Sequence, residues 1–434
     1  MQIPIQWGIP NHIVKIMEKL KTAGFQAYLV GGSVRDMIMG QAPSDYDIAT
    51  SAKPEDVEKL FHRVVKTGVL FGTVTIIGVN GSCEVTTMRR EFDYADFRKP
   101  SYIESTDSLF EDLSRRDFTI NALAYDGENL YDYFGGIDDI KHGTIKTVGD
   151  PLDRFSEDAL RILRAVRLSA QLGFSINHTT QDGMQTNSWR LQRISKERIT
   201  EELLRILNAN YLRESLSLMI DLNIWHYLFP FSISGNNRSG INLTALDYYP
   251  KGIEYRLALI TILFDQYQST LDTSDSNRTS REICESNSSR WFDQLRLDNK
   301  AMRIIRSVRL EYLNIPYSSI VEVRKAMQRM GKNHFPSLMS VLRMMASMKG
   351  YLLSETVGWN QMMLDIIANH DPLTLADLAI KAQDLITLGI EAGPKIGRIM
   401  DLLLVLVMED PHHNETNRLL DLASIIAQDI EGEA

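Results

Sequence analysis

The hydrophobic and polar residues of this chain follow two different periods. Up to about Asp150, short runs rich in β-branched residues alternate with helical segments. The runs Val69–Val79 and Cys83–Met88 predict two strands, and the turn Asn80-Gly81-Ser82 between them indicates a hairpin. From Arg154 onward, strand signals almost disappear and apolar residues recur with the period of a helix. The pattern therefore predicts a small α/β head followed by a long helical remainder.

Three segments interrupt these periods. The segment from Arg89 to Asp112 is charged and aromatic and follows neither period, so it predicts a long mobile loop. The segments Ser232–Asn242 and Ser269–Arg290 are rich in serine and asparagine and predict loops. The helical part is therefore divided by loops.

The composition is typical of a soluble globular protein. The chain has 434 residues, of which 44% are hydrophobic and 24% are charged, so it is long enough for about two to four domains. Its two cysteines, Cys83 and Cys284, lack the spacing of metal ligands. No secretion signal is visible, and no apolar run reaches the roughly 20 residues of a membrane span. We therefore expect a cytoplasmic protein without a membrane partner.

The distribution of charge modifies the picture given by the net charge of −9. Between Arg296 and Lys349, eleven lysines and arginines stand against three acidic residues, a local balance of +8. Lys300, Arg303 and Arg306 recur every three residues and are expected on one helical face. Such a run is often a solvated face, but beside a nucleotide site it favours a surface that follows phosphates.

The first candidate site combines a glycine turn with two nearby carboxylates. Gly31 and Gly32 follow a predicted buried strand and precede a predicted short helix, an arrangement in which backbone N–H groups approach a phosphate closely. Asp45 and Asp47 follow in a strand-like run, where residues two apart point to the same side. Glu84 is either a third carboxylate of this site or a charge on an edge strand. This combination suits two Mg²⁺ ions in phosphoryl or nucleotidyl transfer, whereas the aspartates alone would indicate a surface turn.

A second candidate lies in the segment from Arg115 to Ala122. If this segment is helical, Asp117 and Asn121 lie one turn apart on the same face. Its arginines could hold a triphosphate bidentately, and its carboxylate and amide suit ribose hydroxyls. The same residues could equally form a capped helix start.

A third candidate begins at Ser156, which would cap a helix whose first turn contains Glu157 and Asp158. Asp158 and Arg161 lie three residues apart, so that they would present an acceptor beside a group of donors. Such a pair could recognise the base edge shared by cytosine and adenine, which carries an exocyclic amine, and would reject uracil and guanine. Both interpretations remain open from the residues alone.

Six motifs in this order resemble the series that defines class II tRNA nucleotidyltransferases, the CCA-adding enzymes. They are Gly31-Gly32-Ser33-Val34-Arg35-Asp36, Asp45-Tyr46-Asp47, Arg115-Arg116-Asp117-Phe118-Thr119-Ile120-Asn121-Ala122, Gly135-Gly136-Ile137-Asp138-Asp139, Glu157-Asp158-Ala159-Leu160-Arg161 and Ser195-Lys196-Glu197-Arg198-Ile199. The segment Leu388–Gly397 is similar to the tail of the bacterial branch that lacks an HD domain.

This resemblance implies an α+β head like that of polymerase β, followed by an all-α neck, body and tail. We expect a nucleotidyltransferase head over residues 1–150, a helical neck with the nucleotide-selecting motif over 151–215, a helical body over 216–300 and a helical tRNA-binding tail over 301–434. The implied reaction is template-independent addition of C, C and A to the 3′ end of tRNA from CTP and ATP. No protein partner is implied.

The resemblance also implies roles for individual residues. Asp45, Asp47 and Glu84 would be catalytic, and Asp45 and Asp47 would bind Mg²⁺. Nucleotide binding would fall to Gly31, Gly32, Arg35, Arg116, Asp117, Asn121, Asp158, Arg161, Arg164 and Arg167. Glu157 would orient Arg161, and the Arg89–Asp112 segment corresponds to the loop that is needed for the change to ATP. The segment around 190–205 would support the neck without taking part in the chemistry.

Other functions remain as alternatives. An A-adding tRNA nucleotidyltransferase would have almost the same motifs. A poly(A) polymerase is disfavoured because the run Leu70–Ile76 lacks the arginine-rich strand of that branch. An inert RNA-binding protein is disfavoured by the intact Asp45 and Asp47, and a metal-dependent phosphoesterase by the lack of a His/Asp cluster.

Overall fold

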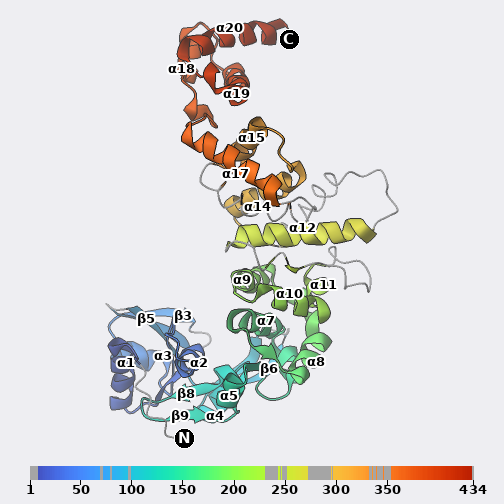
Figure 1. The fold of residues 1–434 in the computed structure, drawn as a ribbon. Helices are drawn as coiled ribbons and strands as arrows, with labels where there is room; N and C mark the ends of the chain where they lie inside the picture. The colour runs from blue at the N-terminus through green and yellow to red at the C-terminus, as the bar shows by residue number, and fades with distance from the viewer. Residues whose placement is uncertain are drawn as a thin grey trace. The chain divides into compact units, whose positions relative to one another are not determined.

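The computed structural model describes most of the chain as two compact units (Figure 1). The described residues are 8–68, 72–78, 81–95, 99–229, 243–244, 246, 252–271, 295, 297–331, 335, 339, 346 and 353–432. The first unit comprises residues 1–239 and 293–296, and the second comprises residues 240–292 and 297–434. Because each unit contains a hydrophobic core cluster of its own, we describe them separately.

A seven-stranded sheet forms the centre of the predicted head, with strand order β3-β4-β5-β2-β1-β8-β9. β2 and β5 run parallel, whereas the other neighbouring pairs are antiparallel. The strands are β1 (Ala27–Val30), β2 (Asp47–Thr50), β3 (Val64–Gly68), β4 (Thr73–Gly78), β5 (Gly81–Thr87), β8 (Leu123–Tyr125) and β9 (Leu130–Asp132). The predicted β4–β5 hairpin is confirmed by the pairing of Gly78 with Gly81, while Val79 and Asn80 fall outside the described residues.

Three helices accompany this sheet (Figure 1). They are α1 (Asn11–Thr22), α2 (Gly32–Ile38) and α3 (Pro54–Leu60). α1 and α2 pack against β1, and α3 packs against β4. The chain passes directly from β1 into α2 because Gly31 adopts a φ of 75°, a backbone conformation that glycine reaches without strain. The predicted order of strand, glycine turn and helix is therefore confirmed.

The segment from Arg89 to Asp112 is not the irregular loop that the sequence predicted. It contains an antiparallel pair of strands, β6 (Arg89–Ala95) and β7 (Lys99–Ser105), and the start of α4 (Leu109–Ser114). These two strands form a sheet of their own, separate from the seven-stranded sheet. A backbone hydrogen-bond ladder needs no alternation of apolar side chains, so the pattern gave no strand signal and the prediction was wrong.

Helices make up most of the rest of the first unit. They are α5 (Gly136–Lys141), α6 (Pro151–Glu157), α7 (Leu160–Leu172), α8 (His178–Asn187), α9 (Lys196–Leu207), α10 (Leu212–Asp221) and α11 (Ile224–Leu228), with a 3₁₀ segment at Ser188–Arg193. Two short strands, β10 (Thr144–Ile145) and β11 (Ser175–Ile176), pair in parallel. α7 packs against α9 and α10 and buries Ile162, Leu163 and Val166, which confirms the helical period read from the sequence.

Gly136 explains part of the Gly135–Asp139 motif. A Cβ atom at this position would lie 2.2 Å from the backbone oxygen of Thr119, so only glycine lets α5 approach the short 3₁₀ helix Thr119–Asn121. The hydroxyl of Thr119 also donates a 2.6 Å hydrogen bond to Asp139. α5 thereby fixes the loop that carries Asn121.

Among the residues described, the second unit contains helices and connecting turns but no strand. Its longer helices are α12 (Ile253–Leu271), α14 (Asn299–Asn314), α15 (Ile320–Met330), α17 (Leu353–Ala368), α19 (Pro394–Glu409) and α20 (Thr416–Gly432), and α18 (Ala382–Thr387) is short. Packing of α18, α19 and α20 buries Leu385, Leu403 and Leu419 completely. The predicted loop Ser232–Asn242 lies outside the described residues, as does 272–290, whereas 269–271 belong to the end of α12.

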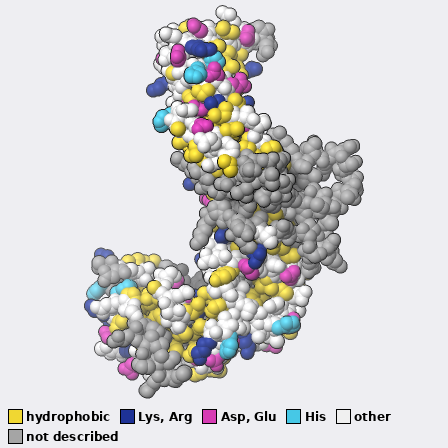
Figure 2. Space-filling view, viewed as in Figure 1, with side chains coloured by type: hydrophobic (Ala, Val, Ile, Leu, Met, Phe, Trp, Pro, Cys, Tyr) yellow, Lys and Arg dark blue, Asp and Glu magenta, His cyan; other side chains and the backbone are white. Residues whose placement is uncertain are grey.

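The basic run of this unit is divided between surface and interior. Lys300, Arg303 and Arg306 are exposed on α14, as their spacing predicts. Arg309 and Arg324 are instead buried and form ion pairs of 2.5 Å with Asp265 and 2.7 Å with Asp371. Arg329 pairs with the buried Glu311 at 2.5 Å. Figure 2 shows acidic and basic side chains of the described residues interspersed on the visible face. The surface excess of positive charge is therefore smaller than the sequence count of +8 suggests.

Neither unit contains a helix that could cross a membrane, as far as its residues are described.

Candidate functional site

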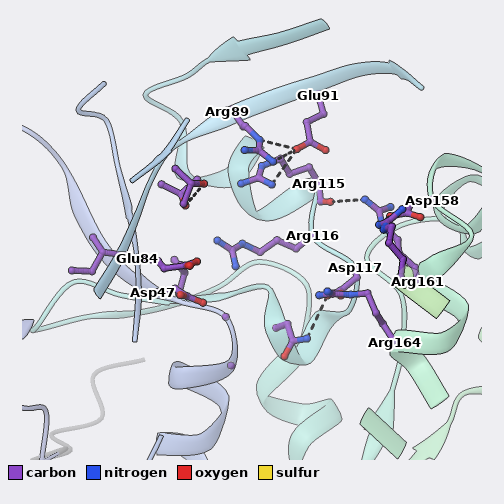
Figure 3. Close-up of a pocket in the computed structure, with 18 residues that line it drawn as sticks. Asp47, Glu84, Arg89, Glu91, Arg115, Arg116, Asp117, Asp158, Arg161 and Arg164 are labelled. Atoms are coloured by element: carbon purple, nitrogen blue, oxygen red, sulfur yellow. Dashed lines mark hydrogen bonds and ion pairs between the residues drawn. The ribbon is translucent and has the colours of Figure 1, made fainter. Parts of the chain in front are cut away.

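A cavity of about 650 Å³ lies within the first unit, beside the seven-stranded sheet (Figure 3). On the sheet side it is lined by Gly31, Gly32, Asp47 and Glu84. The 115–121 segment contributes Arg116, Asp117 and Asn121. Arg161 and Arg164 of α7 complete the lining together with Asp158, which lies between α6 and α7. Most of the residues predicted from the sequence therefore meet at one cavity.

Asp47 and Glu84 are brought together by the parallel pairing of β2 and β5. The two residues are direct partners in the strand register, and Figure 3 shows their side chains next to each other. Burial, with the charges of Asp45 and Glu84, raises the pKa of Asp47 to about 6, although Arg116 acts in the opposite direction. Asp45 is exposed just before β2 and is not one of the residues that line the cavity.

This carboxylate cluster fits a divalent cation. Asp47 is half-buried, and Asp45 and Glu84 are exposed. Neighbouring carboxylates that repel each other are stabilised by a cation, and carboxylate oxygens are the ligands that Mg²⁺ prefers. Within the described part of the chain, no three acidic, histidine or cysteine side chains form a complete set of metal ligands. Protein sites for Mg²⁺ commonly use only one or two carboxylates, with substrate phosphates and water completing the coordination.

Arg116 points toward the carboxylate pair from the opposite side of the cavity (Figure 3). Its Nη1 would lie 3.2 Å from a Cβ atom at Gly31, so the glycine leaves the room that the guanidinium occupies. Arg35 does not line the cavity; its guanidinium binds Asp36 at 2.6 Å and donates a 2.8 Å hydrogen bond to Asn121. Arg35 therefore acts on the cavity through the position of Asn121.

The helix predicted for Arg115–Ala122 is reduced to the 3₁₀ turn Thr119–Asn121. The Asp117 carboxylate accepts a 2.9 Å hydrogen bond from the backbone N–H of Phe118, which has an extended conformation that a helix excludes. Asp117 and Asn121 nevertheless meet, at 3.4 Å, as a helix would have placed them. The prediction was wrong for the backbone and right for this pair.

Asp117 also forms an ion pair with Arg164 of α7, with Nη2 2.6 Å from the carboxylate. Burial alone would raise the pKa of Asp117, but the charge and hydrogen bonds of Arg164 lower it to about 2. Asp117 is only 7% exposed, so the carboxylate depends on this partner. The pair joins the sheet-side segment to the helical part of the same unit.

This pKa predicts a specific acid sensitivity. A carboxylate with a folded pKa near 2 and an ordinary value near 4 stabilises the fold above about pH 4, and that stability is lost as the pH falls toward 2. We expect Asp117→Asn to melt at a lower temperature than wild type at pH 7, with a difference that shrinks between about pH 4 and pH 2. Thermal melts across this range test it, with Asp138→Asn as control, because Asp138 is an exposed acid that forms a surface ion pair with Lys141. A difference that stays constant down to pH 2 would contradict the assignment.

Asp158 lies between two helices and does not belong to the first turn of one. α6 starts at Pro151 and is capped by Asp150, so Ser156 lies in its last turn and the predicted Ser156 cap was wrong. Asp158 instead accepts a 3.0 Å hydrogen bond from the N–H of Leu160 at the start of α7. Pro151 occupies the first position of α6, a position that proline favours, so the helix starts five residues before Ser156.

Arg161 is held from two directions. Its Nη1 lies 2.5 Å from the Glu157 carboxylate, and its Nη2 donates a 3.3 Å hydrogen bond to the backbone oxygen of Arg115. The orientation of Arg161 by Glu157 therefore has the expected geometry. Arg167 points elsewhere: it forms a 2.9 Å ion pair with the buried Glu202 and does not line the cavity.

Six polar residues that line the cavity were not predicted from the sequence: Thr73, Thr86, Arg89, Glu91, Arg115 and Arg198. Arg89 and Glu91 lie on β6, in the segment predicted to be a loop, and form a 2.6 Å ion pair. Arg115 binds both Glu91, at 3.2 Å, and the buried Asp112, at 2.6 Å. Arg115 and Arg198 belong to two of the motifs quoted above, and this membership was the sequence signal that could have identified them. Their partners Glu91 and Asp158 are brought to them by the tertiary structure.

The cavity thus has two chemically different sides. Asp47 and Glu84 form a carboxylate side, and Arg116 faces them. The opposite side presents Asp158 and Arg161, an acceptor and a donor group of the kind that recognises a base edge. A nucleoside triphosphate has both a polyanionic part and a base edge, so its chemistry matches both sides.

Comparison with known proteins relates two segments of the first unit to families of polymerase domains. A family described as the poly A polymerase head domain matches residues 27–146, and one described as a probable RNA and SrmB-binding site of polymerase A matches residues 173–233. A CCA-adding enzyme of Leuconostoc mesenteroides is 48% identical over 215 residues, which cover 49% of this chain and 53% of the relative. A CCA-adding enzyme of Staphylococcus aureus is 39% identical over 269 residues, 62% of this chain and 66% of the relative. The chain thus spans about half the length of several curated relatives that it matches.

Solved structures extend the likeness of the fold to the whole chain. The CCA-adding enzyme of Bacillus stearothermophilus, solved in complex with CTP, has a TM-score of 0.76 and 28% identity, with complete coverage of both chains. The Thermotoga maritima CCA-adding enzyme, complexed with tRNA, has a TM-score of 0.60 and 21% identity over 96% of both chains. The expected α+β head followed by helical parts is therefore confirmed.

Proposed function

Because this chain belongs to the tRNA nucleotidyltransferase family, we propose that it adds C, C and A to the 3′ end of tRNA from CTP and ATP without a nucleic-acid template. The observation that carries the proposal is that the Asp47–Glu84 pair and the Asp158–Arg161 pair line one cavity. Chemistry and base selection can then act on the same nucleotide. With this activity we propose a cytoplasmic location.

Nucleotidyltransferases of this family generally use divalent metal ions, and we propose Mg²⁺ held by Asp45 and Asp47, with Glu84 beside them. When bound, Mg²⁺ lowers the pKa of the attacking 3′-hydroxyl and neutralises charge on the phosphates. The hydroxyl attacks the α-phosphate of the nucleotide, and pyrophosphate leaves. Arg116 and the N–H groups near Gly31 and Gly32 bind the triphosphate and keep it in line with that hydroxyl.

We assign base selection to Asp158 and Arg161. The Asp158 carboxylate accepts from the exocyclic amine that cytosine and adenine share, and Arg161 donates to ring acceptors. Uracil and guanine present a carbonyl oxygen where that amine would be, so they leave the carboxylate facing an acceptor. Asp117 and Asn121 contact the ribose in this proposal. Arg35 and Arg164 support the site through Asn121 and Asp117, whereas Arg167 pairs with Glu202 away from the cavity.

We keep the four-part division as a proposal, with a head over 1–150, a neck over 151–215, a body over 216–300 and a tail over 301–434. The tail binds tRNA through its phosphates. The exposed Lys300, the last residue of the body, and Arg303, near the start of the tail, contribute to the binding surface.

We expect the double variant Lys300→Gln/Arg303→Gln to weaken tRNA binding. The slope of log affinity against log salt concentration should also become smaller, by the amount that corresponds to about two lost phosphate contacts. Binding titrations at several salt concentrations measure both quantities. Lys59→Gln/Lys66→Gln, which removes two exposed cations from the first unit, is the control. Equal affinities and salt slopes in wild type and the α14 variant would rule out a phosphate contact there.

The proposed activity is tested with a tRNA transcript that lacks its three terminal nucleotides. Incubation with Mg²⁺ and CTP, ATP or both is followed by product sizing at single-nucleotide resolution. Two additions from CTP alone and a stop at three with both nucleotides establish CCA addition. A long ladder from ATP alone would mean a poly(A) polymerase, and extension only of tRNA ending in CC would mean an A-adding enzyme. Binding without extension would leave an RNA-binding protein.

A further inference from the structure

Asp158 is held in place by a residue from a distant part of the chain. Its Oδ1 accepts from the N–H of Leu160, and its Oδ2 accepts a 2.9 Å charge-assisted hydrogen bond from Nη2 of Arg198. Arg198 comes from the first turn of α9, forty residues further along the sequence, and lines the same cavity. The Asp158 carboxylate is therefore fixed by two donors from two helices.

This arrangement leaves Asp158 able to bind a base. Each carboxylate oxygen has two lone pairs, so Oδ2 accepts from Arg198 and keeps a further acceptor position. The Asp158 side chain retains 16% of its exposure and the Arg198 side chain 26%. A carboxylate that is held in a fixed orientation discriminates better than one that rotates, because rotation lets it follow an incorrect base.

The Arg198 guanidinium binds Asp158 directly, with Nη2 2.9 Å from Oδ2. A charge-assisted hydrogen bond of this kind fixes the direction of both side chains. Glu157 has the matching position on the other side, where it binds Arg161. Each member of the base-facing pair thus has an oppositely charged partner of its own.

We propose that Arg198 is a positioning residue for nucleotide selection, acting through the orientation of Asp158. The inference rests on the proposed function, since it assigns base selection to Asp158. It predicts that loss of Arg198 lowers discrimination between correct and incorrect nucleotides more than it lowers tRNA binding.

The variant that tests this is Arg198→Gln, with Arg205→Gln as its matched control. Arg205 lies seven residues later on α9, close to the same face, and is 57% exposed with its nearest acid, Glu202, at 3.9 Å. The readouts are kcat and KM for CTP and UTP and for ATP and GTP, with tRNA affinity and melting temperature measured alongside. We expect a loss of discrimination on the order of tenfold in Arg198→Gln, partial recovery in Arg198→Lys, and wild-type discrimination in Arg205→Gln.

A double-variant comparison separates positioning from folding. If Arg198 acts through Asp158, adding Arg198→Gln to Asp158→Asn causes no further loss of discrimination. The double variant removes both charges of the ion pair, so neither charge is left without its partner. A further loss of discrimination in the double variant would overturn the inference while the proposed function stands. Wild-type discrimination in a folded Arg198→Gln protein would do the same. Failure of the wild-type protein to add CTP or ATP to tRNA would overturn both.

Discussion

Asp47→Asn is expected to abolish nucleotide addition while leaving the fold intact. The change removes a charge from the cluster that holds the metal ions in the proposed mechanism, and we expect kcat/KM to fall by at least about 10³-fold, equivalent to roughly 4 kcal/mol. The melting temperature is expected to stay level or rise, because burial and the charges of Asp45 and Glu84 make ionised Asp47 unfavourable.

Single-turnover incorporation of CTP and ATP, with melting curves on the same samples, measures both effects. Asp56→Asn is the control, since it removes an acid of α3 that forms an ion pair with the exposed Lys59. Turnover of Asp47→Asn within about tenfold of wild type would show that the carboxylate pair is not the metal site.

Asp112→Ala is expected to cause the largest loss of stability. Asp112 is fully buried and accepts hydrogen bonds from both Arg115 and Arg116 and from the backbone N–H of Arg89. Burial alone would raise the pKa of Asp112, but the two arginines lower it, so the carboxylate is charged in the fold. Its removal leaves buried donors without an acceptor, which costs about 3 to 5 kcal/mol of unfolding free energy.

For a unit of this size, that loss corresponds to a decrease in melting temperature of more than about 6 °C. Thermal melts of Asp112→Ala and of Asp138→Ala make the comparison, because Asp138 is 75% exposed and its ion pair with Lys141 lies at the surface. We also expect reduced activity below the melting temperature, since Arg116 loses the carboxylate that holds it near Asp47. If both variants melt within about 2 °C of wild type, the buried network does not stabilise the head.

The local parts of the site could be predicted because they depend on neighbouring residues. A glycine pair between an apolar run and a short helix specifies a turn wherever it occurs, and β1, Gly31 and α2 have that form. The proximity of Asp47 and Glu84 depends instead on the parallel register of β2 and β5. That register is set by packing of the whole sheet, so the sequence left Glu84 with two interpretations.

The failures have different physical causes. At Asp117, a side chain that bonds to the backbone N–H of Phe118 competes with the helix that the spacing favours. The sequence pattern placed Arg309, Arg324 and Arg329 on a solvent-exposed surface. In the structure they form ion pairs with Asp265, Asp371 and Glu311, which are remote from them in the sequence. The role of Arg198 was missed for the same reason, because its spacing within α9 is that of any exposed helical arginine.

The ion pair between Asp117 and Arg164 bears on where this protein can be divided. The proposed boundary at residue 150 separates a buried carboxylate from the cation that lowers its pKa, because Arg164 lies beyond it on α7. A fragment ending at residue 150 would retain every strand of the seven-stranded sheet and still contain an acid with no counter-charge from this arginine. The sheet is therefore a topological domain without being an electrostatically independent one, and the smallest fragment that preserves its charge balance extends at least through α7.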